Sequence, residues 1–149
     1  MKQEYCTPTQ HPKWFGLAVQ ALVILSQEDK SIACPSIELA KYLQSEPSLL
    51  RRILSVLAKE GFIGTREGRD GGYHLRKPAE SIQLVDVYDV FRSGSRLSFG
   101  ITETAGTHPL GKCMKSTLED ITQEMDDSIR GVLSKYTIAD LANQLEAKL

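Results

Sequence analysis

Hydroxyl and guanidinium side chains recur along one face of the segment 46–60, where a helix is expected. Ser48, Arg51, Arg52 and Ser55 follow the three- and four-residue spacing of neighbouring positions on a helix. Arginine can bond O6 and N7 of guanine together, and serine hydroxyls and a helix N-terminus can hold phosphate. This face therefore has the chemistry to read a major groove; the alternative is the solvated charged face of an ordinary surface helix.

A second group of cationic side chains lies in the glycine-rich stretch GTREGRDGGYHLRK, residues 64–77. The pattern predicts two short strands, 62–66 and 73–76, joined by a loop that brings Arg66 and Arg69 to its tip. No Gly-Lys-Ser/Thr follows, so the stretch does not match a nucleotide phosphate loop. A helix pair followed directly by such a hairpin is the order of a winged helix-turn-helix, whose wing lies against the DNA backbone or minor groove.

The helix at 46–60 must be anchored for its polar face to act. The sequence predicts one apolar stripe along it, formed by Leu50, Ile53, Leu54 and Leu57. Ser45 is a suitable N-cap, Pro47 is tolerated in a first turn, and Gly61 is a suitable stop. One face of this helix is thus expected to dock and the other to remain available.

Two further helices are expected ahead of it. Trp14–Leu25 is apolar almost all round but too short to span a membrane, which predicts a buried helix. Pro35 is placed to begin a helix that runs to about Leu43, about three residues before the helix at 46–60. In that second helix we expect Ile37, Ala40 and either Tyr42 or Leu43 to face inward.

The last third of the chain predicts a long helix, from about Gly111 to Lys135. Its apolar positions alternate mostly in steps of four and three residues. At 25 residues it is about 37 Å long, too long for one small domain to cover, so we expect it to pair with its copy in a second chain. The stripe consists of Met114, Leu118, Ile121, Met125 and Val132, and the acidic residues expected to be solvated are Glu119, Asp120, Glu124, Asp126 and Asp127.

A final helix is expected after it. Thr137 and Asp140 have the spacing of a capping box, with Ile138, Leu141 and Leu145 predicted to pack inward.

Composition and charge narrow the class of protein. The chain has 149 residues and a net charge of −1, yet residues 41–77 carry eight basic against four acidic side chains, whereas residues 81–149 carry seven against ten. Such asymmetry is typical of a protein that meets nucleic acid with one part, although uneven surface charge without function is the alternative. Without an apolar run of about 18 residues or a secretory signal, we expect a cytoplasmic protein that contacts no membrane.

The sequence shows no grouping of residues that is typical of a catalytic site. The three histidines, His11, His74 and His108, are far apart and no nucleophile or acid pair lies at a telling spacing, so we expect no enzyme. Cys6, Cys34 and Cys113 are too few and too scattered for a disulfide framework.

A family resemblance rests on the sequence from Ser36 to Val90. The pattern L-x-x-x-G-x-I-x-x-x-x-G-x-x-G-G-Y-x-L, which runs here from Leu57 to Leu75, precedes an I-x-L-x-D-V tail at residues 82–87. Together these closely resemble the Rrf-two family of bacterial transcription regulators, which includes the iron–sulfur cluster assembly regulator, the nitric-oxide-sensing repressor and the cysteine metabolism repressor. The resemblance is clear over about residues 10–92.

The resemblance implies a mostly α-helical fold with a small β-hairpin. The expected parts are a winged helix-turn-helix DNA-binding domain at 10–92, a loop at 93–111 and a helical dimerisation arm at 112–149. The implied function is a sequence-specific regulator: a homodimeric repressor that reads a roughly palindromic operator on double-stranded DNA. The recognition helix at about 46–60 would enter the major groove, with the wing at 62–76 beside it.

The family's DNA-contacting residues carry over unevenly. Ser48 and the wing glycines match the family, but Leu49 stands where an aromatic residue is common, and Glu67 stands where the wing usually has an arginine. Because a glutamate is repelled by phosphate, we expect the flanking arginines to make the wing contact. The predicted DNA-binding set is Ser48, Leu49, Arg51, Arg52, Ser55, Arg66, Gly68, Arg69, Gly71, Gly72 and Tyr73.

The family's iron–sulfur members carry three clustered cysteines near the start of the long helix, where this chain has only Cys113. Since thiolates are the main cluster ligands, we expect no cluster, other metal or cofactor, although His108 and Cys113 with an oxygen ligand is a conceivable metal site. Cys113 is a candidate redox sensor, and the loop at 93–111 is where a small-molecule or redox effector could act. The alternative function is a winged-helix module for protein interaction or redox sensing with little DNA binding, which Glu67 and the near-neutral charge favour.

Overall fold

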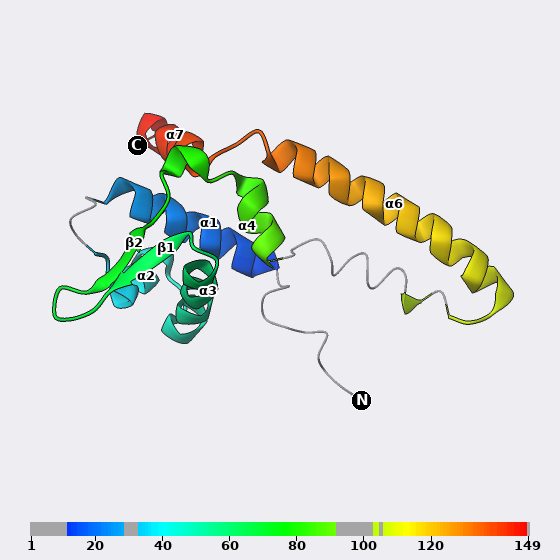
Figure 1. The fold of residues 1–149 in the computed structure, drawn as a ribbon, viewed down its shortest axis with the longest axis horizontal. Coiled ribbons are helices and arrows are strands. Elements are labelled where there is room, and N and C mark those ends of the chain that lie inside the picture. The colour runs from blue at the N-terminus through cyan, green and yellow to red at the C-terminus, as the bar shows by residue number, and fades with distance from the viewer. Residues whose placement is uncertain (1–11, 29–32, 92–102, 105, 149) are drawn as a thin grey trace.

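The computed structural model describes residues 12–28, 33–91, 103–104 and 106–148, and Figure 1 shows their arrangement. A body of short helices and one two-stranded hairpin carries a long helix on one side. The predicted fold, mostly helical with a single small hairpin, is confirmed. Its elements are α1 (Pro12–Gln27), α2 (Ser36–Leu43), α3 (Pro47–Lys59), β1 (Ile63–Arg66), β2 (Gly72–Leu75), the 3₁₀ turn η2 (Ala79–Ser81), α4 (Leu84–Phe91), α6 (Pro109–Leu133) and α7 (Ile138–Lys148).

Helix α1 is the centre of the body. Ala18, Ala21 and Leu22 have no accessible surface, as expected for a helix that is apolar on almost every side. It contacts α2, α3, α4 and α7 as well as β2. The alanines leave room for neighbouring helices to approach closely, so one helix organises the whole body.

Helices α2 and α3 form the helix-turn-helix pair. Three residues, Gln44 to Glu46, separate them, and Gln44 adopts a left-handed conformation with φ of 50°. Pro47 is the first residue of α3, as predicted, but the N-cap is Glu46 and not Ser45. Ala40 is buried, as predicted, but the prediction for Ile37 was wrong: its side chain is 63% exposed, because Leu39 takes the other inward position of this short helix.

The hairpin follows α3 as the sequence predicts. Antiparallel pairing joins Ile63 to Leu75, Thr65 to Tyr73 and Arg66 to Gly72. Directly paired residues share a face of the sheet, so the buried Ile63 places Leu75 on the same side, against the core. We call β1, β2 and the loop 67–71 between them the wing.

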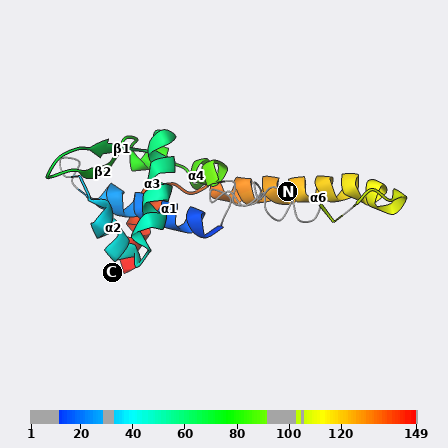
Figure 2. The ribbon, with the colours of Figure 1, turned by 90° about the horizontal axis from the view of Figure 1, so that it is seen from below.

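Helix α6 projects from the body, with its N-terminal end farthest away (Figures 1 and 2). Near the C-terminal end of α6, two side chains contact α4. Asp126 accepts a hydrogen bond of 2.7 Å from the hydroxyl of Tyr88, and Arg130 forms an ion pair with Asp89, both of α4. The expectation that Asp126 is merely solvated was therefore wrong, because α4 supplies it with a donor. Helix α6 begins at Pro109, so the last three residues of the predicted loop 93–111 belong to the helix; residues 93–102 lie outside the described part.

Helix α7 returns to the body after α6. Backbone hydrogen bonds of 2.9 Å run from Ile138 N to Ile82 O and from Leu84 N to Tyr136 O, and Ile138 is fully buried. The predicted capping box is confirmed: Thr137 N donates to the Asp140 carboxylate, and Asp140 N donates to the Thr137 hydroxyl. Leu145 was predicted to pack inward and is instead 41% exposed, because it borders a groove.

The division at residues 92 and 112 into a DNA-binding domain, a loop and an arm stays a prediction.

Among the residues described, no helix has the length and apolar character needed to cross a bilayer.

Candidate nucleic-acid interface

Helix α3 has one buried and one exposed face. The predicted apolar stripe is confirmed, since all four of its residues are completely buried, and the four polar side chains predicted to meet DNA are all exposed. The stripe packs into the core that α1 organises, so it holds the polar face in a fixed orientation. The buried set is Leu50, Ile53, Leu54 and Leu57, and the exposed set is Ser48, Arg51, Arg52 and Ser55.

The start of α3 is more constrained than the sequence indicates. The Ser48 hydroxyl donates a hydrogen bond of 2.7 Å to the Glu46 carboxylate, so a phosphate contact by this hydroxyl requires that bond to be exchanged. Leu49 is half-buried and packs against the core. Spacing alone does not reveal the Ser48 hydrogen bond, because that bond depends on where the turn before α3 places Glu46.

The wing presents its cationic side chains at one end. Arg66 ends β1 and Arg69 lies in the loop beyond it, and both are exposed, as is the Glu67 between them. At Gly71 a Cβ atom would lie 2.3 Å from the Arg66 carbonyl oxygen, so no side chain fits there. This glycine therefore allows the loop to fold back onto the end of β1.

The base of the wing is tied to the helix-turn-helix pair. Gly72 has φ of +152°, and a Cβ atom there would lie 2.4 Å from the carbonyl group of Cys34. Tyr73, which follows it, is half-buried and forms an isolated antiparallel bridge with Cys34. Sequence reasoning missed Cys34 as a structural contact, because the contact is made by its backbone and leaves no signal in residue type.

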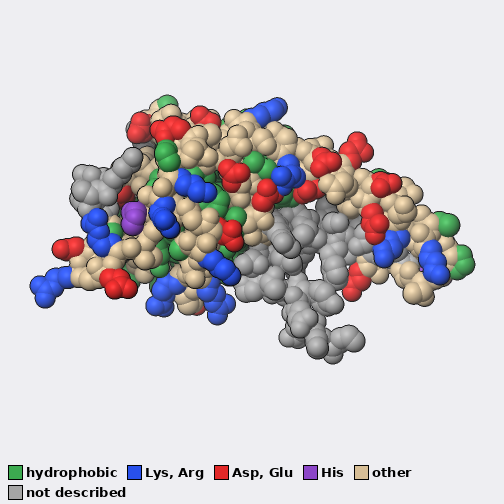
Figure 3. Space-filling model, in the orientation of Figure 1, with side chains coloured by type: hydrophobic (Ala, Val, Ile, Leu, Met, Phe, Trp, Pro, Cys, Tyr) green, Lys and Arg blue, Asp and Glu red, His purple; other side chains and the backbone are tan. Residues whose placement is uncertain are grey.

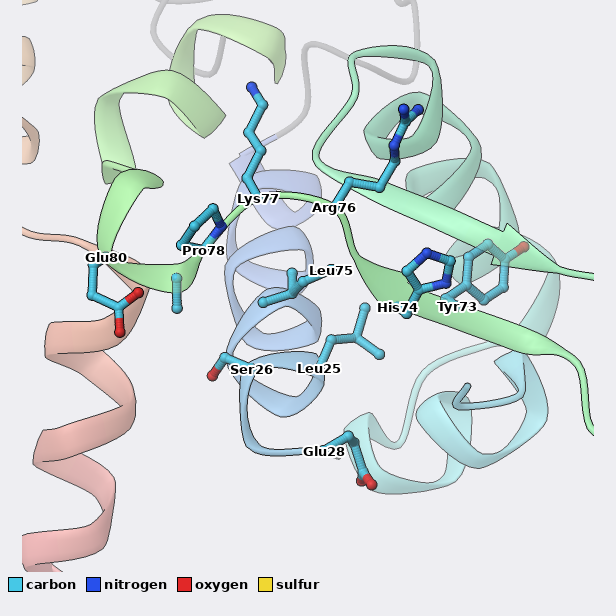
Figure 4. Close-up of a pocket in the computed structure, with 11 residues that line it drawn as sticks. Leu25, Ser26, Glu28, Tyr73, His74, Leu75, Arg76, Lys77, Pro78 and Glu80 are labelled. Atoms are coloured by element: carbon cyan, nitrogen blue, oxygen red, sulfur yellow. The ribbon is translucent and has the colours of Figure 1, made fainter. Parts of the chain in front are cut away.

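A cavity of about 380 Å³ lies where β2 meets the end of α1 (Figure 4). Leu25 and Leu75 contribute apolar surface to it, while the side chains of Arg76 and Lys77 point away from α1. His74 is half-buried, and within the described residues its Nδ1 has no hydrogen-bond partner. The ring lies across Gly64, where a Cβ atom would be 2.8 Å from His74 Nε2.

Charged side chains of the two signs are unevenly distributed over the molecule. Figure 3 shows Lys and Arg side chains gathered over the part of the body that holds α3 and the wing, with some acidic side chains among them, and both Asp or Glu and Lys or Arg side chains along α6. The positive region therefore coincides with the exposed face of α3. Such a surface raises the local concentration of a polyanion.

The two cysteines within the described residues are far apart in the fold. Cys34 is buried beside β2 and Cys113 is exposed on α6, whereas Cys6 lies outside the described residues. Burial, with smaller contributions from Glu28 and Glu38, raises the pKa of Cys34 to about 11. A thiol held neutral in this way is a poor nucleophile and a poor metal ligand.

The described residues do not assemble a site for a metal or cluster. No group of three His, Cys, Asp or Glu side chains within them could hold an ion. His108 Nδ1 accepts a hydrogen bond of 2.9 Å from Gly111 N, so that nitrogen caps α6. The absence of a cofactor stays a prediction.

Comparison with known proteins decides the family. Residues 13–144 match the family model of Rrf2, described as an iron-dependent transcriptional regulator. The chain belongs to the Rrf2 family. This Rrf2 protein is thus a member of a family of transcriptional regulators and not of enzymes.

Curated relatives agree with this assignment. The Rrf2 chain is 26% identical over 131 residues to the HTH-type transcriptional regulator YffB of Lactococcus lactis. The aligned residues cover 87% of this chain and 84% of that protein. It is 25% identical over 131 residues to the HTH-type transcriptional regulator YwnA of Bacillus subtilis, covering 87% and 95% of the two chains.

Solved structures share the Rrf2 fold. A transcriptional regulator from Lactobacillus plantarum superposes with a TM-score of 0.73 at 28% identity, covering 91% of both chains. IscR of T. potens superposes with a TM-score of 0.69 at 21% identity, covering 91% of this chain and 88% of that one. For CymR of Staphylococcus aureus the TM-score is 0.66 at 19% identity, with 87% and 95% covered. These last two similarities show the fold alone.

Proposed function

We propose that this Rrf2 regulator is a homodimeric repressor that binds a roughly palindromic operator on double-stranded DNA. Helix α3 enters the major groove and the wing lies beside it. The observation that carries the proposal is the exposed face of α3, with Arg51 and Arg52 held over a completely buried stripe. Two exposed arginines on a fixed helix can each bond a guanine edge or a phosphate.

The wing supports the same interface. Arg66 and Arg69 are exposed at its outer end, and arginine suits a narrow groove of strong negative potential. At Gly68 nothing lies within 4 Å of the position of a Cβ atom, so the loop backbone there is bare enough to approach a phosphate backbone, while Gly71 and Gly72 allow the loop to pack against Arg66 and Cys34. The wing is joined to the segment before α2 at Tyr73, so it is positioned together with the helix-turn-helix pair.

The homodimer is inferred from α6. Its apolar stripe stays open in a single chain, with Met114 45%, Ile121 46%, Met125 40% and Val132 52% exposed. A second copy of the same helix would bury this stripe. A two-fold dimer presents two α3 helices, which explains a palindromic operator with half-sites separated by about 34 Å or a multiple of it.

A second candidate is a winged-helix module for protein interaction or redox sensing with little DNA binding. Exposed Glu67 at the wing and exposed Cys113 on α6 favour it. It predicts weak binding to DNA without sequence preference.

The two candidate functions are distinguished by selecting the duplexes that this protein binds from a random DNA library and by measuring its affinity for them at increasing salt concentration. An operator-binding dimer should enrich a palindrome, and its affinity should fall steeply with salt because bound phosphates release counterions. A library that yields no enriched sequence, together with affinity that hardly changes with salt, would favour the second candidate.

A further inference from the structure

Helices α1, α2 and α7 enclose a groove of about 540 Å³ that the DNA interface does not use. This volume is in the range typical of small-molecule sites. Its lining is mostly apolar, and two of the side chains that border it, Tyr42 and Leu145, are 70% and 41% exposed. The apolar lining consists of Val19, Val23, Ile24, Leu43, Leu141 and Leu145.

The polar groups of this groove indicate what it can hold. Gln20, Gln144 and the Tyr42 side chain offer hydrogen bonds, and Lys148 is the one charged side chain among the residues that line it. A groove whose described lining is mostly apolar and includes one cation but no carboxylate complements a molecule that has an apolar body and one negative charge. We propose that the α1–α2–α7 groove binds a small amphipathic carboxylate of the medium-chain fatty acid class.

The position of the groove leaves it accessible in the proposed dimer. Helix α6 projects from the end of the body where α4 lies, and α2 and the end of α7 lie at the opposite end (Figures 1 and 2). A second copy seated on the apolar stripe of α6 is therefore directed away from the groove. This separation favours a small ligand over a second copy as the occupant.

Occupancy has a route to the DNA interface. Leu43 of α2 lines the groove, and α2 packs against α3. A ligand wedged between α2 and α7 can alter the position of α3 only by binding one arrangement of these helices better than another. This regulatory consequence and the accessibility of the groove in a dimer rest on the proposed function, whereas binding of a ligand to the groove of a single chain does not.

The test is calorimetric titration of the full chain with sodium decanoate, below its micelle concentration and without DNA. We expect saturable binding of one decanoate per chain and much weaker binding of decanol, which lacks the charge. Lys148→Glu should weaken decanoate binding about fivefold by replacing an attraction with a repulsion. Leu145→Asp should weaken it at least about tenfold, because it removes apolar surface and adds a like charge.

Two matched variants control for nonspecific effects. Lys115→Glu makes the same charge reversal on α6, and Ile37→Asp makes the same kind of change at an exposed position of α2 that does not line the groove. Both should bind decanoate as the unmodified chain does, with thermal unfolding confirming that all four variants fold. Absence of saturable binding, equal binding of decanol, or affinity unchanged in both groove variants would overturn the proposal. So would light scattering in which Leu145→Asp dissociates an oligomer, since the occupant would then be a second copy.

Discussion

The backbone of Cys34 exchanges two hydrogen bonds with that of Tyr73: Cys34 N donates to Tyr73 O at 2.9 Å, and Tyr73 N donates to Cys34 O at 2.8 Å. This pair joins the segment that precedes α2 to the second strand of the wing. The helix-turn-helix pair and the wing are therefore linked by backbone as well as by packing. A disturbance at this junction should alter both parts of the DNA interface together.

Gly72→Ala tests the junction. The added Cβ would lie 2.4 Å from the Cys34 carbonyl group, where backbone must shift, and the residue has positive φ. We expect a loss of about 1 to 3 kcal/mol in the free energy of unfolding, measured by urea denaturation, and weaker DNA binding. Gly68→Ala is the control: its φ is +103°, but nothing lies within 4 Å of the new atom, so only backbone strain of about 1 kcal/mol is expected. Equal losses in the two variants would contradict a tight junction.

Arg51→Ala and Arg52→Ala test the reading of bases by α3. A side chain that makes a bidentate contact to guanine should lose about 1 to 3 kcal/mol of binding free energy, with relaxed preference at one operator position. Competition binding with single-base variants of the selected operator measures this. A loss that is equal on every sequence would instead assign that arginine to phosphate. Lys115→Ala is the control: this residue lies near the N-terminal end of α6, far from the body (Figure 1), so its substitution should leave operator affinity unchanged.

Glu67→Gln tests the electrostatics of the wing. The exposed Glu67 carboxylate lies between Arg66 and Arg69 in sequence, where it should repel phosphate. Removing its charge should raise affinity for duplex DNA by a few-fold, most clearly at low salt where charges are least screened. Glu119→Gln, on α6, provides the same charge change away from the wing. If Glu67→Gln binds DNA no better than Glu119→Gln, the wing does not approach the phosphates.

Ile121→Asp tests the pairing of α6. A charge in the middle of the exposed stripe would be buried in the proposed dimer, and we expect self-association to weaken by about 2 to 4 kcal/mol. Sedimentation equilibrium measures the change, and operator affinity should fall with it because two half-sites are no longer bound jointly. Ser116→Asp places the same charge on the opposite side of α6 and should leave self-association intact. A chain that is already monomeric without substitution would remove the basis of this prediction.

Cys34 and Cys113 should differ in reactivity. Because burial raises the pKa of Cys34 to about 11, at pH 8 the exposed Cys113 should react with iodoacetamide while Cys34 reacts only after unfolding. The extent of modification at each cysteine is measured by mass spectrometry of digests, after labelling of the folded and of the denatured protein. Modification of Cys34 at the rate of Cys113 in the folded protein would contradict its burial.

The same shift makes stability depend on alkaline pH. The pKa of Cys34 is higher in the folded chain than its ordinary value of 9.0, so its contribution to stability is complete below pH 9 and is lost as pH rises toward 11. The free energy of unfolding should therefore fall across that window by an amount of order 2 kcal/mol, and Cys34→Ala should flatten the fall.

The sequence by itself determined the polar and apolar faces of α3 and most of the elements, although it gave no prediction for η2 or α4. The stripe of Leu50, Ile53, Leu54 and Leu57 and the capping box of Thr137 and Asp140 are local patterns, because a helix relates residues three and four apart whatever surrounds it. The wing was equally predictable, since its strands and glycine loop are adjacent in the chain.

Only the tertiary structure decided which side chains are covered by neighbouring elements and which polar side chains find distant hydrogen-bond partners. Ile37 and Leu145 had apolar spacing but remain exposed, and Asp126 had the character of a solvated residue but bonds Tyr88, 38 residues away. The junction of Cys34 with Tyr73 is made by backbone atoms, which are the same in every residue type. Periodicity reports which face of a helix is apolar, but neighbouring elements decide how much of that face is covered and which polar groups find partners.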